Sequence, residues 1–114
     1  IIGHVADANY RFCSAELGEK NPALMIEKTK TTKAELIAAL REAFAYCDKA
    51  YAGLTDATGV ELIKLSGMDM PRLSALQVNI AHTAEHYGNI ATDMRLKNMV
   101  PPSSEPPARP QPKQ

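Results

Sequence analysis

The sequence predicts an all-α fold of three main helices followed by a proline-rich tail. Three stretches, residues 2–17, 32–52 and 71–97, repeat apolar residues every three or four positions, as an amphipathic helix does. Six of the eight prolines fall after Val100, where the chain cannot continue as a helix and should be extended or disordered. With 114 residues the chain suits one domain, which we expect to span residues 1–100, with the tail at 101–114.

The first helix is predicted to end at Gly18. Its apolar stripe consists of Ile2, Val5, Ala8, Phe12, Cys13 and Leu17. His4 lies one turn before Ala8, on the inner flank of this helix, although a single helical histidine is more often an ordinary core or boundary residue than a metal ligand. Residues 18–31 carry an Asn-Pro breaker and clustered charges, which predict a solvated connection.

The second helix begins with a capping box, Thr32-Lys33-Ala34-Glu35, in which Thr32 and Glu35 satisfy each other's backbone amides. Gly53 provides its stop. We expect the following residues to form its buried stripe: Leu36, Ile37, Leu40, Phe44, Cys47 and Tyr51.

Residues 54–70 give no clear pattern, because the apolar residues from Val60 to Leu65 fit a short helix or an extended segment and glycines interrupt both. Pro71 then suits the first turn of the longest helix, which continues to about Lys97. Asn98 fits a left-handed C-terminal position. We expect this helix to bury Leu73, Leu76, Ile80, Tyr87, Ile90 and Met94.

Composition excludes several functions. Thirteen basic and thirteen acidic side chains leave no net charge, which argues against sequence-independent binding to nucleic acid. No apolar run approaches the roughly 20 residues of a membrane span.

Cys13 and Cys47 fall within helical patterns, so we expect buried free thiols and a reducing, cytoplasmic location. The chain opens without a capping residue or an initiator Met, which suggests an N-terminal truncation; a leader preceding this start therefore stays an open alternative.

The chemistry of the chain centres on two histidines of the last helix. His82 and His86 are four residues apart, so they share one face about 6 Å apart along the axis and can close on one ion. Zinc, nickel, iron and manganese all accept imidazole, and His4 could supply a third ligand. This spacing alone is a weak signal, and Glu85 stands in the wrong place for the H-E-x-x-H motif of metalloproteases.

A polar ridge extends from this pair along the last helix, through Asn79, Asn89 and Asp93. A buried metal site would explain an inward-facing polar ridge, whereas a partly solvated helix flank is the ordinary alternative. Asn79 or Asn89 could orient the ligating histidines through hydrogen bonds without binding the metal themselves.

Three segments together resemble the DinB-like (DinB/YfiT) superfamily. They are Gly3-His4-Val5-Ala6-Asp7-Ala8-Asn9-Tyr10, His82-Thr83-Ala84-Glu85-His86-Tyr87-Gly88-Asn89-Ile90 and Met94-Arg95-Leu96-Lys97-Asn98-Met99-Val100-Pro101-Pro102-Ser103-Ser104. The resemblance covers residues 1 to about 104 and implies a bacterial four-helix bundle in which His4, His82 and His86 hold a divalent metal. Nothing here matches the family's first helix, so the chain resembles a member truncated to three main helices. Asn98 stands where the family usually has glycine, a change that a left-handed cap tolerates.

The resemblance also implies an activity, because characterised relatives include metal-dependent transferases and isomerases that use low-molecular-weight thiols such as bacillithiol or mycothiol. Our leading hypothesis is a thiol-dependent S-transferase acting on an electrophilic substrate. One alternative is a metal-dependent hydrolase, for which Asp93 is the only acidic residue on the ridge, about two turns past His86. The other is a non-catalytic, stress-related bundle stabilised by metal. Homodimerisation through helix faces is compatible with the sequence but is not required by it.

Overall fold

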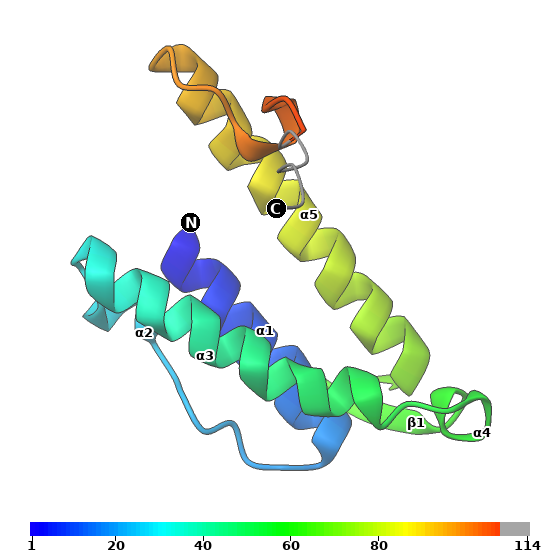
Figure 1. Ribbon diagram of the computed structural model, residues 1–114. Coiled ribbons are helices and arrows are strands. Elements are labelled where there is room, and N and C mark those ends of the chain that lie inside the picture. Colours follow the sequence, from blue (N-terminus) through cyan, green and yellow to red (C-terminus); the bar gives the residue numbers. More distant parts are fainter. Residues whose placement is uncertain (108–114) are drawn as a thin grey trace, which may run out of the picture.

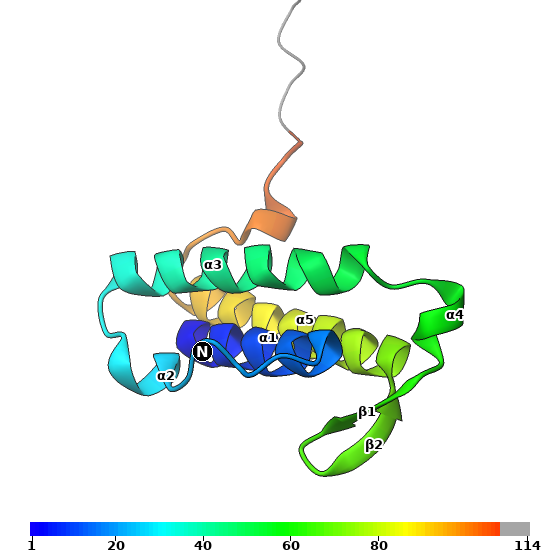
Figure 2. The same cartoon turned by 90° about the horizontal axis from the view of Figure 1, so that it is seen from below.

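The computed structural model describes residues 1–107, and its architecture is set by three long helices (Figure 1). They are α1 (Ile2–Leu17), α3 (Lys33–Ala52) and α5 (Arg72–Leu96). Helix α1 packs against both α3 and α5, whereas α3 and α5 contact each other little and diverge towards the carboxyl end of α5 (Figures 1 and 2). The predicted all-α bundle of three main helices is therefore confirmed.

The ends of the long helices follow the predicted signals. Thr32 accepts a hydrogen bond from the Glu35 amide while the Glu35 carboxylate accepts one from the Thr32 amide, which completes the capping box. Gly18 and Asn98 both adopt left-handed backbone conformations, with φ of 66° and 57°, and end α1 and α5. Gly53 also ends α3, but with right-handed backbone angles.

The buried face of α3 overlaps the predicted stripe at Cys47 but is rotated towards the alanines of the helix. This helix buries Ala39, Ala43, Cys47 and Ala50. Small side chains allow α1 and α3 to approach closely, so the alanine face is the one that packs. Ile37 and Phe44 stay 39% and 41% exposed.

Helix α5 also buries less of its predicted stripe than expected. Leu76 is buried, but Leu73, Ile80 and Tyr87 are exposed. Phe44, Ile80 and Tyr87 line a groove of about 550 Å³ between α3 and α5.

The region with no clear pattern forms a short helix, α4 (Asp56–Gly59), and a hairpin of β1 (Leu62–Leu65) and β2 (Met68–Pro71). The strands pair antiparallel, with Leu65 opposite Met68. Ser66 and Gly67 both have positive φ, of 52° and 81°, as a two-residue type I′ turn requires. Leu65 is buried in a cluster with residues of α1 and α5, so the hairpin fixes where α5 starts.

The connection after α1 contains one helical turn, α2 (Ile26–Thr29), and the chain after α5 contains one 3₁₀ turn, η1 (Pro102–Ser104). Pro101 is fully buried, and the Ser103 amide donates a hydrogen bond to the Tyr87 hydroxyl at 2.9 Å. The rest of the predicted tail, residues 108–114, lies outside the described residues. None of the described helices is both long and apolar enough to span a membrane.

The expectation of two free thiols is wrong, because Cys13 and Cys47 form a disulfide between α1 and α3. Thirty-four residues separate them in the sequence, but the close packing of the two helices brings their Cα atoms to 5.3 Å. No spacing motif signals this pairing, so only the tertiary arrangement could reveal it. The expectation of a reducing compartment rested on two free thiols, so the disulfide removes its support.

Candidate metal centre

Two helices bring the three histidines of the chain to one place. His4 lies in the first turn of α1, and His82 and His86 lie one turn apart in the middle of α5. The Nε2 atom of His82 lies 3.1 Å from that of His4 and 3.2 Å from that of His86. One nitrogen from each ring therefore points at a shared position, and the three ligand atoms lie within 4.8 Å of one another.

The outer nitrogens of the three rings have different surroundings. His4 Nδ1 lies 3.2 Å from a carboxylate oxygen of Glu27, and His86 Nδ1 lies 3.3 Å from the side-chain amide of Asn89. His82 Nδ1 is buried and has no hydrogen-bond partner among the described residues. The expected role of Asn89 thus has a contact to support it.

The surroundings of His82 favour its neutral imidazole. Burial, followed by the neighbouring His86 and His4 rings, lowers the pKa of His82 below its ordinary value. A metal ligand must present a free lone pair, so a histidine that resists protonation remains available for an ion as the pH falls.

A cavity of about 180 Å³ lies against the cluster, lined by His4, Asp7, Ala8 and Arg11. The guanidinium of Arg11 lies 5.0 Å from the centre of the Phe12 ring, and it forms no ion pair within residues 1–107. This cation can therefore attract an anionic group that enters beside His4.

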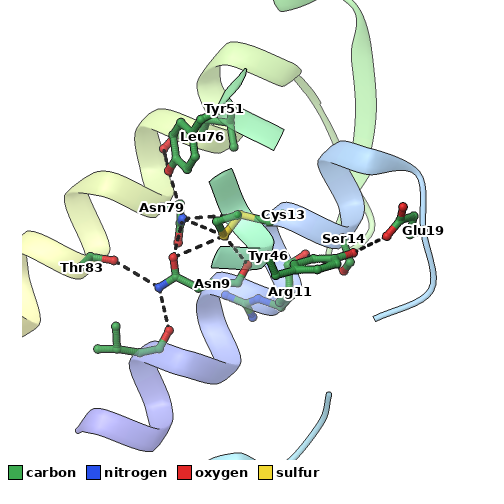
Figure 3. Close-up of a disulfide and its surroundings, with 12 residues drawn as sticks. Asn9, Arg11, Cys13, Ser14, Glu19, Tyr46, Tyr51, Leu76, Asn79 and Thr83 are labelled. Atoms are coloured by element: carbon green, nitrogen blue, oxygen red, sulfur yellow. Dashed lines mark hydrogen bonds between the residues drawn. A yellow bond between two sulfur atoms is a disulfide. The ribbon is translucent and has the colours of Figure 1, made fainter. Parts of the chain in front are cut away.

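Asn79, the other proposed orienting residue, has no hydrogen bond to a histidine of the described chain. It is 1% exposed and lies in a polar network in the core, shown in Figure 3. Its amide nitrogen donates to Asn9 Oδ1 at 3.0 Å and to the Tyr51 hydroxyl at 3.1 Å, and it lies 3.9 Å from each sulfur of the disulfide. Asn79 therefore forms hydrogen bonds with polar groups where α1, α3 and α5 meet. Its position on the polar ridge is explained by this core network and not by the histidines.

Asp93 is exposed and forms no hydrogen bond or ion pair with a described residue. The metal-ligating cluster found in residues 1–107 contains histidines only. Sequence reasoning missed Glu27, which was assigned to a solvated connection, because no periodic pattern shows that this connection folds back onto α1.

Comparison with known proteins gives a family for these features. A family model described as the DinB superfamily matches residues 1–90, a range that includes all three histidines. A search of curated proteins found no match.

Proposed function

The chain belongs to the DinB superfamily, and we propose that it binds a divalent metal ion through His4, His82 and His86. The observation that carries this proposal is the convergence of the three Nε2 atoms from two separate helices. Apolar packing alone gives no reason for three imidazole rings to direct nitrogens at one position, whereas a shared metal ion would.

The distances between the ring nitrogens fit an ion. Zinc–nitrogen bonds of about 2.0–2.1 Å in a tetrahedral site place neighbouring nitrogens roughly 3.3 Å apart. The separations of 3.1 and 3.2 Å around His82 are close to that value. Three imidazoles suit zinc, nickel, iron or manganese and leave coordination positions for other molecules.

We propose further that the protein is an enzyme, namely an S-transferase that uses a low-molecular-weight thiol and an electrophilic substrate. A bound divalent ion would act as a Lewis acid that stabilises the thiolate of the cosubstrate. The histidines would hold this centre, and Arg11 beside the 180 Å³ cavity would attract an anionic group of the thiol. The cytoplasmic location and the homodimer stay predictions, to be tested by fractionation and by measuring the mass in solution.

The hydrolase alternative needs a general base within reach of an attacking water. The histidine cluster of the described residues includes no carboxylate, and the one carboxylate that touches a histidine, that of Glu27, lies at the outer nitrogen of His4. The non-catalytic alternative would favour a closed set of four ligands, whereas three are present. We therefore place the transferase first.

The test compares wild-type protein with His86→Ala, and uses Glu85→Gln as a control on the exposed side of the same helix. Elemental analysis should give about one divalent ion per chain for wild type and control, and far less for His86→Ala. The metal-loaded protein should then consume a low-molecular-weight thiol in the presence of an alkylating electrophile, and His86→Ala should not. Wild-type protein that folds but takes up no added zinc, nickel, iron or manganese would refute both proposals. Metal uptake without thiol consumption would refute the transferase alone.

A further inference from the structure

The connection between α1 and α3 folds back onto α1 beside the candidate metal centre. Its anchor is Ile26, the first residue of α2, which is 5% exposed and packs in a cluster with residues of α1 and α3. Burying a side chain of this size stabilises the fold by about 1.5–3 kcal/mol. The turn is therefore anchored to α1, although most of the connection at residues 18–31 is exposed, as the sequence predicts.

Helix α1 holds this turn through Asp7, which lies one turn beyond His4. The Asp7 carboxylate accepts hydrogen bonds from the backbone amides of Ile26 and Glu27, both at 2.9 Å. These amides begin α2 and have no partner within the turn, so a carboxylate satisfies them well. Because Asp7 and His4 belong to the same helix, the start of α2 is fixed relative to the His4 ring.

The turn also approaches the backbone of α1 very closely. A Cβ atom added to Gly3 would lie 2.6 Å from the Cα atom of Glu27, a distance that real Cβ atoms essentially never show. Only glycine at position 3 permits this contact. Gly3, Asp7 and Ile26 thus act together to place Glu27 next to His4, with one carboxylate oxygen 3.2 Å from Nδ1.

We propose that Glu27 is a positioning residue of the metal centre, and this inference rests on the proposed metal-binding function. The His4 Nδ1–H donates to the Glu27 carboxylate, which leaves the lone pair of Nε2 directed at His82, 3.1 Å away. A carboxylate in this position fixes the ring orientation and the tautomer of a ligating histidine and makes it a stronger electron donor.

The three rings differ in a way that makes Glu27 testable. His86 has an amide at its outer nitrogen and His82 has no partner there, so among residues 1–107 Glu27 is the one charged side chain that hydrogen-bonds to the cluster. Losing such a partner typically weakens metal binding by 10- to 100-fold. The side chains of His4 and Glu27 are 42% and 54% exposed, and water competes for this contact, so we expect an effect near tenfold.

The experiment measures the zinc dissociation constant of the full chain at fixed pH, by competition with a chromophoric chelator. Wild type is compared with Glu27→Ala, Glu27→Gln and Glu85→Gln. Glu85 precedes His86, is exposed and forms no hydrogen bond to a histidine, so its substitution removes the same charge near the site without removing a contact. Thermal unfolding of the metal-free variants checks that each one folds like wild type.

We expect Glu27→Ala to bind zinc about tenfold more weakly than wild type. The affinity of Glu27→Gln should fall between these two, because its amide oxygen can still accept the hydrogen bond. The affinity of Glu85→Gln should stay within about twofold of wild type. Nitrogen NMR of metal-free protein should show the His4 proton on Nδ1 in wild type and a mixture of tautomers in Glu27→Ala. Asp7→Ala should weaken zinc binding through the same contact, so its effect should not add to that of Glu27→Ala.

The inference is overturned if Glu27→Ala binds zinc as tightly as wild type. It is also overturned if Glu27→Ala and Glu85→Gln weaken binding equally, since the effect would then come from charge at a distance. Wild-type protein that binds no zinc or other divalent ion would instead reject the proposed function, and the role of Glu27 with it.

Discussion

The ion pair between Arg72 and Glu16 should contribute strongly to the attachment of α5 to α1. Arg72 is the first residue of α5, and its Nε atom lies 2.8 Å from a carboxylate oxygen of Glu16 near the end of α1. Its Nη2 donates to the Glu16 backbone carbonyl at 3.1 Å and its Nη1 to Glu61 at 3.0 Å. The Glu16 side chain is completely buried, and its second oxygen has no partner in the described chain.

Substituting Arg72→Met should therefore leave a buried carboxylate without a counter-ion. Breaking a buried ion pair from one side costs about 3–5 kcal/mol. The Arg72 side chain is 23% exposed, so water can reach part of the site, and we expect a loss near 3 kcal/mol. An unfolding entropy of about 2.1 cal/mol/K per residue converts this loss to a decrease in Tm of roughly 10–15 °C for a chain of this size.

Urea unfolding followed by circular dichroism measures this loss. The matched control is Asp69→Asn, which breaks the exposed Lys64–Asp69 pair of the hairpin, also 2.8 Å long, and should cost less than about 1 kcal/mol. The double variant Glu16→Leu/Arg72→Met removes both charges and should recover much of the stability. A cost below 1 kcal/mol for Arg72→Met, or a double variant less stable than Arg72→Met, would refute the reasoning.

Three further predictions concern the site and its supports. In metal-free protein, burial lowers the pKa of His82, so folded protein binds this proton less readily than unfolded protein; stability should fall as the pH drops below about 6.5. Thermal unfolding in chelator between pH 8 and 5 should show a smaller loss for His82→Gln, and an equal loss would contradict this cause. Reducing the Cys13–Cys47 disulfide, whose half-cystines are 34 residues apart, should lower the free energy of unfolding by about 3–4 kcal/mol. Thiol titration of denatured protein should find none of these thiols before reduction, and two thiols at that stage would show that the bond is absent. Gly3→Ala should displace Glu27 and weaken zinc binding by a similar factor to Glu27→Ala, whereas unchanged binding would mean that the turn can shift without cost.

The helices and their ends were predictable because their signals are local. The capping box at Thr32, the glycine after α1 and the left-handed Asn98 each act within a few residues, and the structure has helix boundaries within a residue or two of those expected. The spacing of His82 and His86 likewise guarantees a shared face in any α-helix. The Ser66–Gly67 turn was a local signal too, and it could have identified the hairpin.

Other features depend on which helix faces meet. The choice between the alanine face of α3 and the face carrying Phe44 is decided by how closely α1 approaches, which periodicity does not encode. The disulfide and the core position of Asn79 follow from the same approach.

The sequence by itself therefore determined the three long helices, their caps and the pair of histidines on one face of α5. The family resemblance named His4 as the third ligand, and the tertiary structure brings it to the pair. Only the tertiary structure decided that the two cysteines are bonded and that Glu27, 23 residues after His4 in the sequence, lies against its ring. The physical reason is range: backbone hydrogen bonds and caps link residues a few positions apart, whereas side-chain packing selects contacts between residues that the sequence separates widely.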